Sequence, residues 1–364
     1  MKILLLGEYS GVHSTLAMGL RQLGHEVTVA SNGDFWKDYP RDTDLARTPG
    51  KLGGMKLLAK VGSLLPQWRG YDVVQLINPM FLELKAERIA HVYRYLRRHN
   101  RAMVLCAMGL DYYWVHECIT RKPLRYSDFN FGDELRTDPI AIRDRDDWLK
   151  TPKGELNKEI AKDCDAIVAS PYENYACYKP LFADKTTFMP FPIVPQQNID
   201  DSGNIDTVKL FIGISKGRSA YKGTDIMLRA AEDLQSRYQD RMQLMKAEGV
   251  PFAKYQKMMD GSDAIMDQLY SYTPAMNALL AMSKGIVVIG GGEPENYEIL
   301  GEQELRPIVN VLPSYDSVYK ETEQLLLHKE RIPILKIQSQ EYIRRHHHYL
   351  KVARQYETMY RRII

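Results

Sequence analysis

Short apolar runs alternate with segments of helical spacing through the first part of the chain. The runs have the length of buried strands and lie at Ile3–Leu6, Glu26–Ala30, Asp72–Ile77, Ala102–Ala107 and Asp165–Ala169. Between the first two runs, Ser14–Leu23 places its leucines on one helical face and ends before Gly24. Strands separated by helices predict an α/β fold, with a parallel, doubly wound sheet that helices cover on both faces.

A second alternation of the same kind follows a change in composition at Met189–Asn204. This stretch holds three prolines and then a polar run, as interdomain linkers do. Beyond it the pattern predicts strands at Val208–Ile214, Arg241–Ala247, Ile286–Ile289 and Ile308–Leu312. It predicts helices at Asp225–Tyr238, Pro251–Met259 and Pro274–Met282, and a short element at Ala264–Leu269. We therefore expect two Rossmann-like domains, 1–195 and 205–340, with ligands in a cleft at the carboxyl ends of their strands.

The composition agrees with a globular protein of two domains. The chain has 364 residues, of which 45% are hydrophobic and 26% charged. Its net charge of only +3 argues against a dedicated nucleic-acid binder. The four cysteines form no CxxC pair and indicate free thiols in a reducing compartment. We find no apolar run of about 18 residues and no signal peptide in MKILLLGEYS, and so expect a cytoplasmic protein.

A long segment, Asp111–Lys158, fits neither alternation. It is too long for an ordinary connection, so we expect an irregular insertion at about 111–160. The insertion either forms part of a site for a sugar acceptor or lies on the surface. Its aromatic residues suit stacking on sugar rings: Tyr112, Tyr113, Trp114, Tyr126, Phe129 and Phe131. Packing of the insertion onto its own domain explains the same residues, because buried aromatic side chains usually serve packing.

A basic loop follows the predicted strand Val208–Ile214, in the sequence KLFIGISKGRSAYK. Arg218 and Lys222 bring two cations to the carboxyl end of the strand, and Gly217 and Gly223 let the backbone come close to a ligand. Such a loop can hold the diphosphate of a nucleotide sugar, because fixed cations stabilise the charge that builds on a diphosphate leaving group. The alternative is a solvated basic loop without a ligand.

A glycine-rich turn, Gly290–Glu295, follows the predicted strand Ile286–Ile289. Successive N–H groups around Gly291 and Gly292 can form an anion-binding nest, and Glu293 and Glu295 lie beside them. The alternative is a plain turn into a helix that starts near Pro294. We assign these four residues to the donor site as candidates.

The first loop of the chain, Gly7–His13, lies at the carboxyl end of the first strand. Its glycines do not make a GxGxxG fingerprint, so a dinucleotide cofactor is not indicated. We assign Ser10 and Gly11, with Tyr112 from the insertion, to an acceptor surface. The candidates for a catalytic base are His13, Glu8 and Asp111. For His13 the alternative is a structural role at a helix start.

Several segments together resemble one known family. They are MKILLLGEYSGVHSTLAMGLRQLGHEVTVAS, DCDAIVASPYENY, MPFPIV, LFIGISKGRSAYKGTDIMLRAAEDL, LLAMSKGIVVIGGGEPE and HHHYLKVARQYETMYRRI. Their order and spacing resemble the GT-B-fold glycosyltransferases of the family 4 / group 1 type, most of all the members of bacterial polysaccharide biosynthesis. The resemblance covers most of the chain except about 111–160.

The resemblance implies transfer of a sugar from a nucleotide-diphosphate donor to a glycan or lipid-linked acceptor. In the family the reaction needs no metal, usually retains the anomeric configuration and uses no cofactor beyond the donor. Arg218 and Lys222 correspond to the family's diphosphate-binding pair, and Gly11 to its N-terminal glycine loop. The last segment, 341–364, resembles the closing helix that crosses back onto the N-terminal domain.

One departure from the family pattern leaves the activity open. The family carries two glutamates eight positions apart, and Tyr272 and Leu280 stand at these positions. Leucine cannot accept a hydrogen bond from a ribose hydroxyl, and loss of a charge-assisted hydrogen bond typically costs about 1.5–3 kcal/mol. Either Glu293 or Glu295 holds the donor instead, or activity is weak or lost. The family's catalytic histidine also has no clear match; Asp111 and His116 lie nearest.

Three hypotheses therefore stay open at the level of sequence. The first is a glycosyltransferase, the second a catalytically silent GT-B protein that binds an active partner, and the third a nucleotide-sugar epimerase.

A peripheral membrane role is a further option for Met55–Trp68 and the basic Tyr93–Arg101, although helices of this kind usually pack on a sheet. The consecutive His346, His347 and His348 cannot all face one metal ion from a helix.

Overall fold

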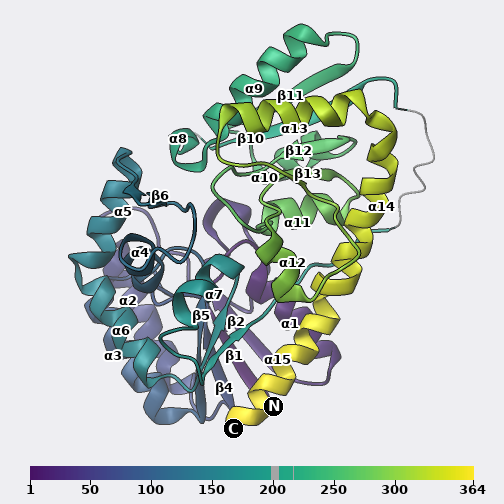
Figure 1. Cartoon of the computed structure of the whole chain (residues 1–364). Coiled ribbons are helices and arrows are strands. Elements are labelled where there is room, and N and C mark those ends of the chain that lie inside the picture. The colour runs from purple at the N-terminus through teal and green to yellow at the C-terminus, as the bar shows by residue number, and fades with distance from the viewer. Residues whose placement is uncertain (198–204, 216) are drawn as a thin grey trace. The chain divides into compact units, whose positions relative to one another are not determined.

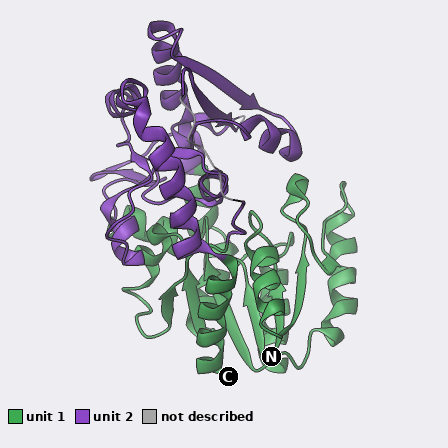
Figure 2. Cartoon of the chain, turned by 90° about the vertical axis from the view of Figure 1, so that its right-hand side faces the viewer, with its two compact units in different colours: residues 1–123, 143–192, 349–364 green, residues 124–142, 193–348 purple. Residues whose placement is uncertain are grey.

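The computed structural model describes residues 1–197, 205–215 and 217–364 (Figure 1). It divides into two compact units, which Figure 2 shows in different colours. Unit 1 comprises Met1–Pro123, Arg143–Pro192 and Tyr349–Ile364, and unit 2 comprises Leu124–Ile142 and Ile193–His348. The chain therefore passes from one unit to the other four times.

Unit 1 is built on a parallel seven-stranded sheet in the order β3-β2-β1-β4-β5-β8-β9. Its strands are β1 (Lys2–Leu6), β2 (Glu26–Ser31), β3 (Thr43–Asp44), β4 (Val73–Leu76), β5 (Ala102–Ala107), β8 (Ala166–Ala169) and β9 (Thr186–Phe188). The central strands are buried along their whole length because helices cover both faces. This confirms the doubly wound sheet and the five strands expected from the sequence.

Helices α1 (Val12–Gln22) and α15 (Tyr349–Ile363) pack together on one side of this sheet, and α3 (Ala86–His99) packs with α6 (Pro152–Asp163) on the other (Figure 1). The remaining helices are α2 (Gly53–Leu64), α4 (Tyr112–Ile119), α7 (Tyr172–Tyr178) and α5 (Pro139–Leu149), which spans the boundary between the units. Gly19 allows the close approach of α1 and α15, because a Cβ there would lie 2.6 Å from the Cβ of Ala353. The last helix therefore belongs to the core of unit 1.

Unit 2 is built on a parallel five-stranded sheet in the order β11-β10-β12-β13-β14. Its strands are β10 (Val208–Ile214), β11 (Met242–Glu248), β12 (Ala264–Met266), β13 (Val287–Gly290) and β14 (Val309–Asn310). Its helices are α8 (Ser219–Lys222), α9 (Thr224–Arg237), α10 (Phe252–Met259), α11 (Met276–Ser283), α12 (Pro294–Leu300), α13 (Tyr315–Leu327) and α14 (Ile332–Tyr342). Apolar residues of α9, α13 and α14 pack with the strands in one buried core. The second parallel sheet is therefore confirmed as well.

The structure differs from the expected domain division in its boundaries. Residues 124–142 belong to unit 2, although we expected them inside the N-terminal domain, and unit 2 extends to His348 rather than to residue 340. The expected insertion at 111–160 is not irregular throughout, because it holds α4, α5, the start of α6 and a short antiparallel pair, β6 (Asn130–Phe131) and β7 (Glu134–Leu135). Of the linker predicted at Met189–Asn204, residues 198–204 lie outside the described part of the chain.

None of the described helices is both long enough and apolar enough to cross a membrane. Helix α2, the candidate for a membrane-surface role, buries Leu57 and Val61 and exposes Met55 and Lys56. Its apolar stripe is therefore used at least in part for packing within unit 1.

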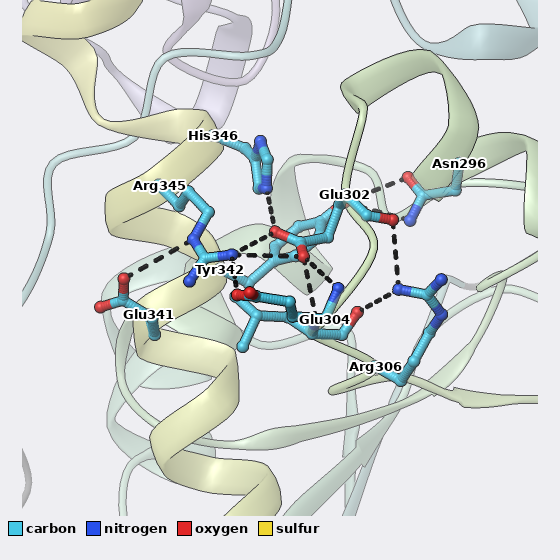
Figure 3. A network of polar contacts seen from close by, with 9 residues as sticks. Asn296, Glu302, Glu304, Arg306, Glu341, Tyr342, Arg345 and His346 are labelled. Atoms are coloured by element: carbon cyan, nitrogen blue, oxygen red, sulfur yellow. Dashed lines mark hydrogen bonds and ion pairs between the residues drawn. The ribbon is translucent and has the colours of Figure 1, made fainter.

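A buried carboxylate anchors the end of unit 2, just before the chain returns to unit 1 (Figure 3). The Glu302 side chain is only 1% exposed and accepts hydrogen bonds from His346 Nε2 at 2.6 Å and from Arg345 at 3.1 Å. His346 and Arg345 lie on a π-helical stretch, η4 (Ile343–His347), that continues α14. Burial disfavours the ionised carboxylate, but the hydrogen bonds from His346 and from two backbone N–H groups outweigh it and lower the pKa of Glu302 to about 2.

We expect Glu302→Gln to lower the free energy of unfolding at neutral pH by about 1–3 kcal/mol, because it removes the charge that Arg345 and His346 share. Glu304→Gln is a matched control. Glu304 pairs with the same Arg345 but is 76% exposed, so its loss should cost less than about 1 kcal/mol. Denaturant unfolding of the two variants measures both values.

The difference in the free energy of unfolding between wild type and Glu302→Gln should depend on pH. The folded-state pKa of about 2 lies below the ordinary value of 4.5, so the contribution of Glu302 is complete above pH 4.5 and is lost as the pH falls towards 2. Unfolding curves recorded across this range should converge. A difference that does not change with pH would contradict the role of the charge.

Candidate functional site

The predicted phosphate loop follows β10 and leads into α9. Gly217 has φ 77° and Gly223 has φ 72°, so both glycines adopt the left-handed conformation that other residues rarely take. A Cβ on Gly223 would also lie 2.6 Å from the Cβ of Leu269, so no larger residue fits there. The two glycines thus frame the short helix α8, with Arg218 just before it and Lys222 at its end.

The two cations of this loop belong to a compact local turn. The N–H of Lys222 donates to the carbonyl of Arg218 at 3.0 Å, and the Arg218 guanidinium lies 5.1 Å from the ring centroid of Tyr221. Tyr221 is buried, whereas Arg218 is exposed. The structure therefore places Arg218 and Lys222 one helical turn apart in the loop that follows β10.

The glycine-rich turn at Gly290–Glu295 is explained by packing. A Cβ on Gly291 would lie 2.1 Å from the carbonyl oxygen of Ser271. The N–H of Gly292 donates to Asn310 at 2.9 Å and the N–H of Glu293 to the carbonyl of Tyr272 at 3.0 Å. Two of the N–H groups that a nest would offer are thus used within the protein. The geometry agrees with the plain turn into α12 rather than with the expected anion nest.

Glu293 and Glu295 are held by Arg125, a residue that the sequence analysis did not single out. Its guanidinium donates to Glu293 at 2.8 Å and to Glu295 at 2.6 Å. Tyr126 adds a hydroxyl donor to Glu293 at 2.6 Å, and the backbone N–H of Arg125 donates to the Tyr272 hydroxyl at 2.6 Å. The Glu293 side chain is only 5% exposed, so these donors compensate a largely desolvated charge.

The same segment also contacts the phosphate loop, through Asp128 and Arg136. The carboxylate of Asp128 accepts a hydrogen bond from Tyr221. Arg136 donates to the carbonyl of Ala220 at 3.0 Å, and its guanidinium lies 3.9 Å from the ring centroid of Tyr270. Burial raises the pKa of Asp128, although Tyr221 and the charges of Arg136, Arg218 and Lys222 favour its ionised form. We call residues 124–136, which contact both candidate donor loops, the covering segment.

The sequence contained a signal for the covering segment. Its aromatic residues Tyr126, Phe129 and Phe131 suggest sugar stacking or packing onto the N-terminal domain. Instead, the ring of Tyr126 lies 4.7 Å from that of Tyr272, the residue that stands in place of the family's first glutamate. The segment thus contacts Tyr272, a position at which the sequence differs from the family that it resembles.

In unit 1, Glu8 caps the start of α1. One carboxylate oxygen accepts from the N–H of His13 at 3.1 Å and the other from the N–H of Ser14 at 2.8 Å. The side chain is buried, and burial raises its pKa to about 7 despite these two donors. Both oxygens therefore have a structural role at the helix start.

His13 lies in the core of unit 1. Its Nδ1 lies 2.8 Å from the carbonyl oxygen of Gly7 and its Nε2 lies 3.1 Å from Nε2 of Gln75, so the neutral ring donates through Nδ1 and accepts through Nε2. Gln75 in turn accepts from the Tyr360 hydroxyl at 2.7 Å. The ring is 0% exposed, and burial lowers its pKa to about 4. These contacts support the structural interpretation of His13 and leave no ring nitrogen for a substrate.

Asp111 is the N-cap of α4. It accepts from the N–H of Trp114 at 2.8 Å and from the Tyr178 hydroxyl at 2.7 Å, and burial raises its pKa to about 7. Tyr112, the next residue, is half-buried and stacks on His116 with ring centroids 5.2 Å apart. The side chain of Asp111 is therefore occupied, whereas the ring of Tyr112 is partly exposed.

Ser10 and Gly11 form a loop that residues 34–39 hold in place. Ser10 has φ 52°, and its N–H donates to Asp34 at 2.8 Å. Its hydroxyl accepts from Lys37 at 2.8 Å. Gly11 has φ 85°, and a Cβ there would lie 2.7 Å from the ring of Tyr39. The glycine is thus required by both its conformation and its neighbour.

Among the described residues we find no group of three His, Cys, Asp or Glu side chains that could hold a metal ion.

Solved structures share the fold over nearly the whole length of the chain. Sucrose-phosphate synthase from Thermosynechococcus elongatus has a TM-score of 0.60 at 12% identity, over 100% of this chain and 99% of that one. HepE from Anabaena, in complex with UDP and glucose, has a TM-score of 0.58 at 12% identity, over 98% of each chain. The chain has the GT-B fold.

Another GT-B neighbour is the UDP-GlcNAc 2-epimerase from Neisseria meningitidis bound to UDP-GlcNAc. Its TM-score is 0.54 at 11% identity, over 98% of this chain and 99% of that one. No protein-family model matches the chain, and neither does any curated protein. At these identities the comparisons show the GT-B fold, and membership of family 4 stays a prediction.

We expect His13→Ala to lower the free energy of unfolding by about 2–4 kcal/mol at pH 7.5, because it empties a buried site and removes two hydrogen bonds. The folded-state pKa of about 4 lies below the ordinary value of 6.5, so the contribution of the neutral ring is complete above pH 6.5 and is lost as the pH falls through 4. Denaturant unfolding at several pH values measures this change.

Ser14→Ala is the matched control, because Ser14 is the next residue in the same helix and is only half-buried. Its cost should stay below about 1 kcal/mol. A His13→Ala protein of wild-type stability at every pH would show that the ring does not support the core, and would return His13 to the candidates for catalysis.

Proposed function

We propose that the protein is a glycosyltransferase that moves a sugar from a nucleotide-diphosphate donor to a glycan or lipid-linked acceptor. The observation that carries the proposal is the loop of Gly217, Arg218, Lys222 and Gly223 at the carboxyl end of β10 in a GT-B fold. Open α/β sheets bind ligands at this end of their strands. The resemblance to family 4 adds metal independence, retention of configuration and a place in cell-surface polysaccharide biosynthesis to the proposal.

The chemistry assigned to the loop is stabilisation of the leaving group. When the glycosidic bond of the donor breaks, negative charge builds on the diphosphate oxygens. The guanidinium of Arg218 offers paired N–H donors in a plane, and the ammonium of Lys222 offers a compact charge. Fixed cations of this kind lower the barrier because they need no rearrangement as the charge develops.

Uridine diphosphate sugars are the first donors to test. The Anabaena HepE structure contains UDP and glucose, and the Neisseria epimerase structure contains UDP-GlcNAc. Since both proteins share the GT-B fold with this chain, we propose a nucleoside diphosphate sugar as its ligand as well. We place the protein in the cytoplasm, at the inner face of the membrane when its acceptor is lipid-linked.

A second candidate is a GT-B protein that binds a nucleotide sugar without turnover and serves an active partner. Two observations favour it. The carboxylates proposed to replace the missing glutamates, Glu293 and Glu295, are engaged by Arg125. The candidates for a base in unit 1, Glu8, His13 and Asp111, all have structural partners. An epimerase needs acidic and histidine side chains around the sugar, and the same structural contacts of Glu8, His13 and Asp111 weaken that alternative.

We expect Arg218→Ala and Lys222→Ala each to weaken UDP binding by roughly 1–3 kcal/mol, because each removes a charge-assisted contact to the diphosphate. Isothermal titration with UDP and GDP measures the effect. Lys254→Ala, which removes an exposed cation from α10 in the same unit, is the control and should leave affinity unchanged.

Product analysis then separates the three hypotheses. Transfer of sugar from the bound donor to a glycan or lipid-linked acceptor supports the transferase, binding without turnover supports the silent protein, and conversion of UDP-GlcNAc to its 2-epimer supports the epimerase. Equal affinity of wild type and both loop variants would refute the assignment of the diphosphate to this loop.

A further inference from the structure

The covering segment contacts the candidate donor site at two places within unit 2. At one place Arg125 and Tyr126 bind Glu293, and Arg125 also binds Glu295. At the other, Asp128 and Arg136 contact α8 and the phosphate loop. The segment therefore contacts both groups of residues that the sequence assigned to the donor.

Charge distinguishes the contact at the phosphate loop from ordinary packing. Asp128 is half-buried and accepts a hydrogen bond from the Tyr221 hydroxyl, and the Arg218 guanidinium lies 5.1 Å from the ring centroid of the same tyrosine. A carboxylate is an anion with planar acceptor oxygens, as each phosphate group of a nucleoside diphosphate is an anion with acceptor oxygens. Both would use the same cations of the loop.

A separate ion pair holds the segment down. The side chain of Arg125 is 56% exposed, but those of its partners Glu293 and Glu295 are only 5% and 20% exposed. Its guanidinium also lies 4.9 Å from the ring centroid of Tyr272. The end of the segment that carries Arg125 thus keeps Asp128 close to the loop without depending on Arg218 or Lys222.

The hairpin that follows gives the segment a defined shape. Asn130 donates to the carbonyls of Leu124 and Gly132 at 3.0 Å each, and its backbone pairs with Leu135. Arg136 then returns to the carbonyl of Ala220. The segment is an ordered element that presents Asp128 in one position, not a loose loop.

We propose that the covering segment is an intramolecular inhibitor of donor binding, in which the Asp128 carboxylate takes the place of a donor phosphate on Arg218 and Lys222. The inference rests on the proposed function of the loop and adds its regulation. A nucleoside diphosphate binds after Asp128 leaves, and the covering segment then separates from α8. The apparent affinity equals the intrinsic affinity reduced by the fraction of molecules in which the loop is uncovered.

The test measures binding of UDP, and of inorganic pyrophosphate as a probe that is independent of the base, by isothermal titration on the full chain. Asp128→Asn keeps the size of the side chain and removes its charge, so we expect about 3- to 10-fold tighter binding of both probes. Arg125→Ala releases the other end of the segment and should tighten binding in the same direction. Glu134→Gln, an exposed carboxylate of the same hairpin, is the matched control and should leave affinity unchanged.

Hydrogen exchange gives an independent measurement on wild type. Saturating UDP should increase exchange at the backbone amides of 124–136, because the segment leaves α8 when the ligand binds. Unchanged or greater protection of these amides by UDP would overturn the proposal.

The outcomes for the site and for its inhibitor are distinct. If Arg218→Ala weakens binding but Asp128→Asn leaves it unchanged or weakens it, the loop binds the diphosphate and the covering segment is not an inhibitor. If Asp128→Asn binds either probe and wild type does not, the proposal is supported in its strongest form. If neither protein binds UDP or pyrophosphate, the proposed function fails and the inhibitor fails with it.

Discussion

The candidate donor site is held together by the ion pairs of the Arg125 guanidinium with Glu293 and Glu295. These ion pairs join a residue early in the chain to Glu293 and Glu295, more than 160 positions later. Glu293 is nearly fully buried, and a buried carboxylate without a partner is costly. The ion pair therefore stabilises unit 2 and at the same time holds the covering segment in contact with both loops that were assigned to the donor.

Unit 1 contains a polar network of a different kind. His13 joins Gly7 in the first loop to Gln75 on β4, and Gln75 joins Tyr360 on the last helix. Every member is buried, so each hydrogen bond is needed to satisfy a group that has no access to water. The loop at Gly7–His13 is thus held by the core rather than by a substrate. Residues whose types suggested catalysis there, Glu8 and His13, provide rigidity instead.

The sequence predicted most of the fold because buried parallel strands are continuous apolar runs. β5 and β10 have the predicted bounds, whereas the short edge strands β3 and β9 were missed, since the stretches Thr43–Asp44 and Thr186–Phe188 contain no apolar run. The loop of Arg218 and Lys222 was predicted in its place after β10, and its binding of a diphosphate stays a prediction. The covering segment was not, because a contact such as that of Arg125 with Glu293 depends on the tertiary path of the chain and has no local pattern.

Tyr272 connects the departure from the family pattern to the covering segment. A glutamate at this position would add a third carboxylate beside Glu293 and Glu295, and like charges this close disfavour one another. The tyrosine instead presents its ring to Arg125 and Tyr126 and accepts the backbone N–H of Arg125. Tyr272, which stands where the resembled family has a glutamate, is therefore the residue on which the segment rests. The tyrosine at position 272 and the contact of the covering segment with α8 are therefore parts of one arrangement within unit 2.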